Sequence, residues 1–195
     1  MKTFDLSDKS ELIEKYLVVD FEIYWCTFTG YELGKMSVEQ YCRARRFEIL
    51  LACAVAFNGK ATTIALPPEG EPKPLAYWKQ KLTEILADYD GVICHNAYVD
   101  GFILGDVLKI PIKKLICTNI LARWHGCSRL GGVSLANQSK TLGIYKKGDF
   151  IVQSNGRRWP EFNQTERESF IKYCLQDCYL TLELAKRLTL ALTHS

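Results

Sequence analysis

The sequence predicts a mixed α/β domain in which one sheet is flanked by helices. Two apolar runs of strand length occur in the first third of the chain, a strong hairpin signal follows the second run, and helical periodicity dominates the rest. Because the first three strands are joined by short connections, they are expected to pair antiparallel. The later alternation of helices and strands makes the sheet a mixed one.

The three antiparallel strands are recognised by their β-forming residues. Residues 16–24 (Tyr-Leu-Val-Val-Asp-Phe-Glu-Ile-Tyr) and residues 47–57 are apolar runs that contain only a few acids. Asn58-Gly59 is the strongest short hairpin signal, so residues 60–66 are expected to return as the third strand. These three strands form an antiparallel meander.

The remaining elements are mainly helices. Residues 1–14 are polar and are expected to be a loosely held lead-in, and Ser37 is a candidate cap for a short helix that extends to Arg43. Residues 91–94 form a short buried strand, and Thr165 is a candidate cap for the closing helix. Helices are expected, in chain order, at residues 75–89, 98–108, 115–125, 134–142 and 163–192. This order of elements is that of the ribonuclease H-like architecture.

Length and composition limit the class of protein. The chain has 195 residues, 48% of them hydrophobic and 24% charged, which suits one globular domain spanning residues 1–195. No apolar run approaches membrane-spanning length and the N-terminus has no signal-peptide segment, so a cytoplasmic protein without a membrane partner is expected. The net charge of +3 permits a polyanionic partner without requiring one.

The eight cysteines are expected to be reduced. The sequence contains no Cys-x-x-Cys pair, and most of its cysteines lie within apolar segments. Cys174 and Cys178 lie one helical turn apart, but no second pair of ligands has metal-site spacing. Buried thiols are therefore expected, rather than disulfides or a zinc site.

Two carboxylates interrupt the first strand. Side chains alternate between the faces of a strand, so Asp20 and Glu22 lie side by side on one face. Two like charges on a buried face repel each other and lose hydration, which favours a cation between them. Carboxylate oxygens suit Mg²⁺ or Mn²⁺. The alternative is an edge strand whose acids face water.

Two later motifs contribute further acids. The segment 95–100 (His-Asn-Ala-Tyr-Val-Asp) places Asp100 on the first turn of a helix just beyond a strand end, where open sheets build their sites. Stabilisation of this acid by the helix dipole is the alternative explanation. Tyr173 and Asp177 are four residues apart and therefore share one face of the closing helix, near its apolar side.

The three motifs together carry a family resemblance. Asp-x-Glu on a first strand, Asn-x-x-x-Asp after a middle strand and Tyr-x-x-x-Asp on the last helix resemble the DEDD superfamily of 3′–5′ exonucleases, in its tyrosine-bearing branch. Over nearly its whole length the chain is most similar to the proofreading exonuclease domain of phage-type A-family DNA polymerases. Cys117 departs from the Asp usual at that position, and Val99 departs from an aromatic residue. Further similar stretches lie at residues 46–56, 121–123, 135–142 and 155–162.

The resemblance implies a site that uses two divalent cations, Mg²⁺ or Mn²⁺. It implies that Asp20 bridges both ions. Glu22 and Asp177 would complete the site of the ion that activates water, and Asp100 would help to hold the second ion. Tyr173 would orient the attacking water, because a tyrosine hydroxyl is a poor base at neutral pH.

Contacts with the nucleic acid are expected beside the metal site. Asn96 is a candidate contact for the terminal nucleotide. Arg157, Arg158 and Trp159 combine basic groups with an aromatic platform, which suits single-stranded nucleic acid. A solvated basic loop is the alternative explanation for these three residues.

The resemblance predicts a 3′–5′ exonuclease that releases nucleoside monophosphates from the 3′ ends of single-stranded DNA, in proofreading or DNA processing. Two alternatives stay open: an exoribonuclease, because acids do not select a sugar, and a catalytically idle nucleic-acid-binding or scaffold module of the same fold. Such polymerases continue into a polymerase domain, whereas this chain ends at Ser195. A free-standing exonuclease in a bacterium or phage-infected cell is therefore expected, with a separate DNA polymerase as a candidate partner.

Overall fold

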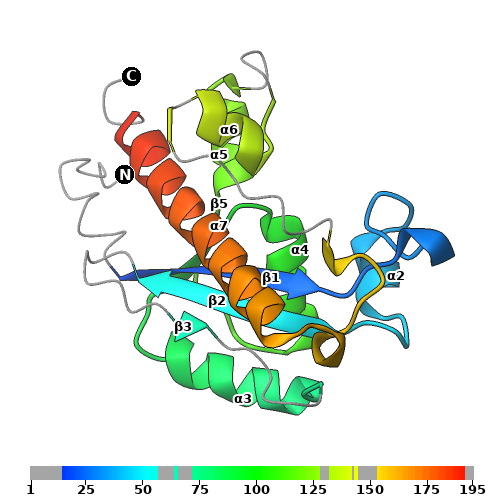
Figure 1. Cartoon of the computed structure of the whole chain (residues 1–195). Helices are drawn as coiled ribbons and strands as arrows, with labels where there is room; N and C mark the ends of the chain where they lie inside the picture. Colours follow the sequence, from blue (N-terminus) through cyan, green and yellow to red (C-terminus); the bar gives the residue numbers. More distant parts are fainter. Residues whose placement is uncertain are drawn as a thin grey trace.

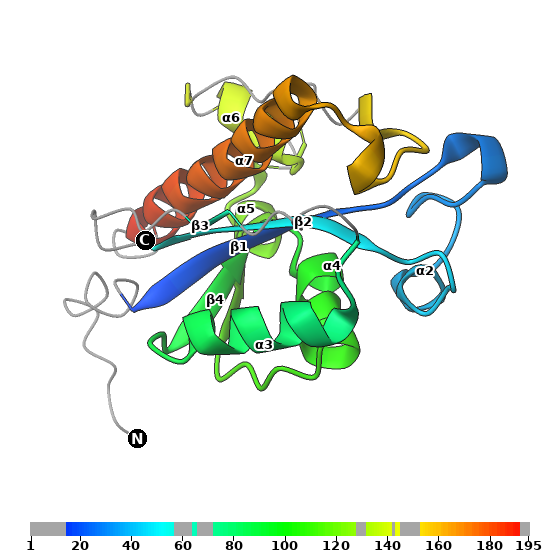
Figure 2. The ribbon, with the colours of Figure 1, turned by 60° about the horizontal axis from the view of Figure 1, so that its bottom comes forward.

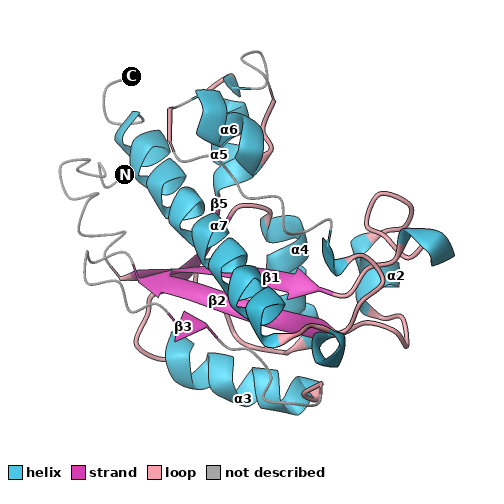
Figure 3. Cartoon of the chain, viewed as in Figure 1, coloured by secondary structure: helices cyan, strands magenta, loops and turns pink. Residues whose placement is uncertain are grey.

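The computed structural model describes residues 15–56, 64–65, 72–127, 132–141, 143–144 and 153–191. Within these residues one mixed sheet has the strand order β3-β2-β1-β4-β5, with helices on both of its faces (Figure 1, Figure 3). The strands are β1 (Tyr16–Ile23), β2 (Ile49–Ala56), β3 (Ile64–Ala65), β4 (Gly91–Cys94) and β5 (Leu115–Cys117). The pairs β1–β2 and β2–β3 are antiparallel, and β1–β4 and β4–β5 are parallel. The predicted mixed sheet is confirmed.

Helices cover the sheet from both sides. The longest, α7, crosses the sheet over β1 and β2, while α3 and α4 lie on the opposite face (Figure 2). The α-helices are α2 (Val38–Cys42), α3 (Leu75–Leu86), α4 (Ala97–Phe102), α5 (Thr118–Trp124), α6 (Leu135–Thr141) and α7 (Gln164–Ala191). A π-helical stretch, Ile103–Val107, extends α4, and short 3₁₀ turns occur at Thr27–Thr29 and Trp159–Glu161. In the described part of the chain, every helix is too short or too polar to span a bilayer.

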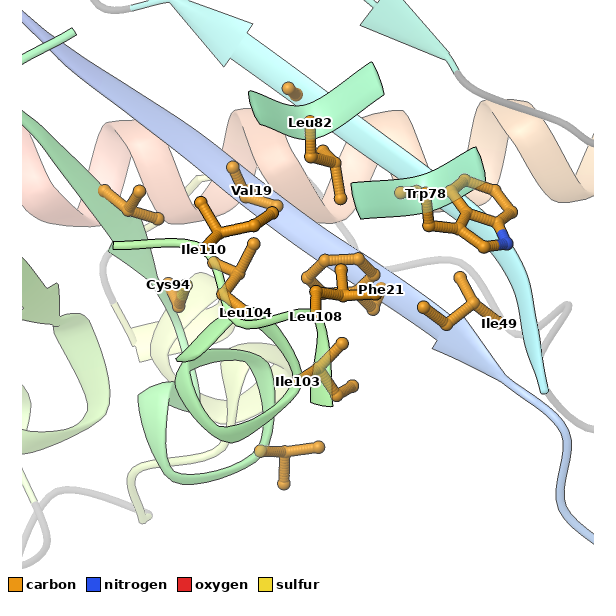
Figure 4. Packing of buried hydrophobic residues seen from close by; sticks show 14 of the residues in the cluster. Val19, Phe21, Ile49, Trp78, Leu82, Cys94, Ile103, Leu104, Leu108 and Ile110 are labelled. Atoms are coloured by element: carbon orange, nitrogen blue, oxygen red, sulfur yellow. The ribbon is translucent and has the colours of Figure 1, made fainter. Parts of the chain in front are cut away.

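Alternation along β1 divides the core into two layers. Leu17, Val19 and Phe21 belong to an apolar cluster with Trp78 and Leu82 of α3. Figure 4 shows Val19, Phe21, Trp78 and Leu82 among the side chains that pack together in this cluster. Tyr16 and Val18 of β1 belong to a second apolar cluster, which packs against α7. That cluster also contains side chains from β2, β4 and the segment before α7: Leu50, Leu51, Cys53, Ile93, Trp159 and Phe162.

Two helix predictions need correction. Residues 115–117 were expected to begin a helix but form β5, because Leu115, Ile116 and Cys117 pair in parallel with β4 and complete that edge of the sheet. The closing helix is not capped by Thr165. Instead, the Glu166 backbone N–H donates to Asn163 Oδ1 at 3.0 Å, while the Asn163 N–H donates to Glu166 Oε2 at 2.8 Å. This reciprocal pair fixes the start of α7.

Other sequence predictions are confirmed where they can be compared. Ser37 caps α2, with Gln40 completing the capping box. All eight cysteines are free, as expected of a reduced protein. The lead-in at 1–14, the Asn58-Gly59 turn and most of the returning strand lie outside the described residues.

Candidate active site

The position of β1 places two acids under α7. Side chains of even-numbered residues on β1 face α7, and Asp20 and Glu22 continue the row of Tyr16 and Val18. Strands β2 and β4 pair with β1 on either side, so β1 is a central strand and the alternative of a water-facing edge strand is excluded. Glu22 is only 6% exposed. The fold thus holds two neighbouring carboxylates side by side, with Glu22 buried and Asp20 half-buried.

A third acid approaches from the adjacent parallel strand. Because β4 runs parallel to β1, the helix that follows it begins near the carboxyl end of β1, and Asp100 lies in its first turn. Burial, together with the nearby charge of Asp20, raises the pKa of the Asp100 carboxyl well above its usual value. The backbone N–H groups of Phe21 and Asn96 partly offset this rise. Asp100 is therefore held close to the β1 acids, where like charges interact strongly.

Helix α7 adds the last two predicted side chains. Tyr173 and Asp177 are both buried, one turn apart on the face that covers the sheet. The Tyr173 hydroxyl hydrogen-bonds the Asp177 carboxylate. Burial, followed by the charges of Asp177 and Glu22, raises the pKa of Tyr173 above its usual value. The hydroxyl consequently stays protonated and acts as a donor.

One cleft brings these elements together. It has a volume of about 440 Å³, and its wall includes the four predicted acids, with His95 and Asn96 beside them. Asn96 is exposed at the start of α4, and its side chain makes no capping hydrogen bond. His95 Nδ1 lies 2.9 Å from Thr118 Oγ1, which ties the start of α5 to the cleft wall. The four predicted acids in the wall of this cleft are Asp20, Glu22, Asp100 and Asp177.

The site has the donor atoms for divalent cations. Carboxylate oxygens of Asp20 and Glu22 lie within 4.8 Å of each other and of the Cys174 sulfur. No lysine or arginine is among the described residues that line the cleft. Buried carboxylates that repel one another are stabilised by hard divalent ions, which prefer oxygen ligands. The residues present therefore fit Mg²⁺ or Mn²⁺.

The predicted strand-binding residues lie in the segment before α7. Trp159 is 2% exposed and packs against Phe162 and Phe170, so it presents no stacking platform to a nucleic acid in this structure. The sequence alone could not show that this indole is buried, because its basic neighbours Arg157 and Arg158 indicated a solvent-facing loop. The stacking role expected of Trp159 is not supported by its position.

Both arginines make contacts within the protein. Arg157 donates from its two Nη atoms to the Glu166 carboxylate at 2.8 and 2.9 Å, with its guanidinium 4.3 Å from the centre of the Phe162 ring. Arg158 forms an ion pair with Glu48 and stacks over the ring of Tyr24 at 4.2 Å. These contacts hold the segment before α7 against the end of β1 and the start of β2.

Hydrogen bonds between two loops reinforce this arrangement. Trp25 Nε1 donates to Ser154 Oγ at 3.0 Å, and the Gly156 N–H donates to the Trp25 carbonyl at 2.7 Å. Thr27 and Asn155 exchange two further hydrogen bonds, at 3.0 and 2.8 Å. The loop after β1 is therefore fastened to the segment that leads into α7, and the two acid-bearing elements keep a fixed relation.

Several residues of the cleft were missed in the sequence. Trp25, Glu32 and Leu33 come from the loop after β1, and Leu135 comes from α6. No sequence periodicity connects these loop residues with β1. Cys174 lies beside Tyr173 and three residues before Asp177, so its helical spacing could have indicated its closeness to the acids.

Comparisons with known proteins give the family and the fold of the chain. The family model described as 3′-5′ exonuclease, of the DNA polymerase A type, matches residues 37–193. A search of curated proteins gives no match. Among solved structures, the chain resembles one titled "apo form of the nuclease" (TM-score 0.59, 15% identity, over 96% of this chain and 78% of that one). It also resembles Trypanosoma brucei RNase D (TM-score 0.58, 13% identity, over 94% of this chain and 61% of that one). These likenesses confirm the ribonuclease H-like fold.

Proposed function

The chain is an exonuclease of the 3′–5′ exonuclease family, within the DEDD superfamily, and we propose that it releases nucleoside monophosphates from the 3′ ends of single-stranded DNA. The observation that carries this proposal is the convergence of the four predicted acids on one cleft, with Tyr173 bonded to one of them. DNA is favoured as substrate because the matching family model is of the DNA polymerase A type. A separate DNA polymerase remains a candidate partner.

We assign the four cleft acids to two divalent cations, Mg²⁺ or Mn²⁺. When bound, such ions stabilise the attacking and leaving oxygens of a phosphodiester during cleavage. Asp20 is the central ligand, since it lies beside Glu22 on β1 and its charge acts on Asp100. Asp177 joins the group from α7.

The protonated hydroxyl of Tyr173 has a positioning role. Because its pKa is raised, it cannot remove a proton from water at neutral pH, but its oxygen can orient a water molecule while its proton bonds Asp177. Asn96 lines the cleft and offers an amide to the terminal nucleotide. Arg158 remains a candidate contact for the phosphate backbone, since its side chain is 37% exposed.

RNA is the second candidate substrate. The fold of T. brucei RNase D is similar, and a ligand set of carboxylates does not itself distinguish ribose from deoxyribose. The choice depends on contacts with the terminal 2′ position. A matched pair of substrates therefore decides between the two.

The test uses 5′-labelled single-stranded DNA and an RNA of the same sequence. Each is incubated with the full chain and Mg²⁺, Mn²⁺ or EDTA. We expect a ladder that shortens from the 3′ end, requires the metal ion, and is produced faster from DNA. Faster cleavage of RNA would instead assign the exoribonuclease activity.

Two variants control this test. Asp20→Asn removes the central ligand and should abolish cleavage. Asp106→Asn changes an acid of the same type that is 52% exposed and lies away from the cleft lining, and it should cleave like the wild type. Strand binding without cleavage of either substrate would contradict the proposed function.

A further inference from the structure

One side chain that the proposed function does not use lies beside the acid pair of β1. The Cys174 thiol donates to Asp20 Oδ2 at 3.6 Å and to the Asp20 backbone carbonyl at 3.8 Å. One ligand atom from each of Asp20, Glu22 and Cys174 lies within 4.8 Å of the others. Cys174 is fully buried on α7, in the helical turn between Tyr173 and Asp177. Packing therefore holds a sulfur atom next to the two carboxylates.

Sulfur and oxygen ligands select different ions. Carboxylates suit Mg²⁺ and Mn²⁺, whereas a thiolate favours Zn²⁺ and other thiophilic ions. Two carboxylates and one thiolate are a ligand mixture that Zn²⁺ accepts. To coordinate the ion, the Cys174 thiol loses the proton that it donates to the Asp20 carboxylate. That proton passes to solvent as the ion binds.

We propose that Cys174 gives the acid pair a second mode of ion binding, in which Asp20, Glu22 and the Cys174 thiolate hold one thiophilic divalent ion such as Zn²⁺. This ion displaces Mg²⁺ or Mn²⁺ from the same carboxylates and therefore inhibits cleavage. The inhibition rests on the proposed function. The binding of the ion does not.

A second cysteine on α7 provides a matched control. Cys178 lies one turn beyond Cys174 and is also fully buried. Its thiol donates to the Cys53 carbonyl at 3.5 Å, and it is not part of the group of metal-ligating atoms found among the described residues. Replacing Cys178 therefore perturbs the same helix and the same core without removing the proposed ligand.

The first experiment titrates the ion-free, reduced full chain with Co²⁺ and follows the absorption spectrum. Cobalt bound to a thiolate gives a charge-transfer band in the near ultraviolet, which needs no catalysis to be observed. We expect the band in the wild type and in Cys178→Ser, and its loss in Cys174→Ser. Asp20→Asn should weaken the band, because Cys174 alone does not hold the ion.

The second experiment measures affinity and inhibition. Competition with a chromophoric chelator should show that Cys174→Ser weakens Zn²⁺ binding about tenfold or more, while Mn²⁺ binding changes much less. Zn²⁺ should inhibit Mg²⁺-dependent cleavage by the wild type and Cys178→Ser at lower concentrations than it inhibits Cys174→Ser. Equal inhibition of all three proteins would contradict the proposal.

Each outcome can be attributed to one proposal. A folded Cys174→Ser protein that keeps the band, or a wild type without one, overturns the thiolate site. If circular dichroism shows that Cys174→Ser does not fold, the variants Asp20→Asn and Glu22→Gln test the site instead. A band that persists unchanged in both variants would show that the ion binds elsewhere. Cleavage without the band refutes the thiolate site alone, whereas the band without cleavage refutes the proposed nuclease function alone.

Discussion

The two faces of β1 are buried in different ways. Toward α3 and α4, Val19 and Phe21 pack into a cluster of apolar side chains around Trp78 (Figure 4). Toward α7, the row that starts with apolar residues continues with Asp20 and Glu22 and ends at the cleft. One strand thus contributes to a dry core with its odd-numbered residues and to a polar site with its even-numbered ones.

The difference indicates how stability and chemistry are divided. Burial of apolar area favours folding, whereas burial of like charges opposes it. Burial and the nearby charge of Asp20 raise the pKa of Asp100, which reflects that opposition where the acids meet at the cleft. We therefore expect the apolar residues on the α3 face of the sheet to stabilise the fold without taking part in cleavage. The acids on the α7 face should take part in cleavage and lower the stability of the fold.

The largest expected effect is on the α3 face. Trp78 is fully buried, so Trp78→Ala should lower the free energy of unfolding by about 3–5 kcal/mol, because it loses buried area and leaves a cavity. Urea denaturation measures the change, and cleavage by the remaining folded protein should be unaltered. Leu75→Ala, at a position 42% exposed on the same helix, is the control. A change below about 1 kcal/mol for Trp78→Ala would show that this face does not carry the stability.

On the α7 face, Tyr173→Phe should separate chemistry from stability. The variant keeps the ring that packs under α7 and loses only the hydroxyl beside Asp177. We expect cleavage to slow by up to about a hundredfold through loss of water positioning, with Mn²⁺ affinity nearly unchanged. Single-turnover cleavage and Mn²⁺ titration check these two results. Unaltered cleavage would remove the positioning role.

The relative placement of two pairs of site side chains could be predicted from the sequence, because it depends on local periodicity. Alternation along β1 was enough to put Asp20 and Glu22 on one face, and a spacing of four put Tyr173 and Asp177 on one turn of α7. The sequence could not predict the surroundings of Trp159, because the burial of that indole depends on distant partners such as Phe170. The same reason explains residues 115–117, which are a strand only because β4 is available to pair with them.

The loss of stability that results from placing several acids in one cleft can be measured with Asp100→Asn in EDTA. The raised pKa means that folded Asp100 holds its proton more tightly than the unfolded chain does. Wild-type stability therefore falls as the pH rises above the ordinary value of 3.8, and the variant does not share this fall. Urea denaturation should show the variant gaining stability relative to the wild type as the pH rises. A stability difference between the two proteins that stays constant as the pH rises would contradict this expectation.

The smallest expected effect concerns the segment that fastens α7 to the sheet. Arg157, followed by the Asn163 backbone N–H, lowers the pKa of Glu166 to about 2. The stabilisation from this ionised carboxylate is complete above its ordinary value of 4.5 and is lost as the pH falls toward 2. Glu166→Gln should therefore lower the Tm slightly at neutral pH and not at all near the folded pKa.

A neighbouring acid on the same helix provides a control for Glu166→Gln. Glu168 accepts a hydrogen bond from Gln164 at 2.7 Å on the exposed side of the same helix. Glu168→Gln therefore removes the same charge as Glu166→Gln and leaves the contact between Arg157 and Glu166 in place. If only Glu166→Gln lowers the Tm, and only at neutral pH, the Arg157 contact stabilises the start of α7. Equal shifts in both variants would instead attribute the effect to the helix dipole, which acts on any acid in the first turns. Because Tyr173 and Asp177 lie beyond this contact on α7, cleavage should stay close to the wild-type rate in either case.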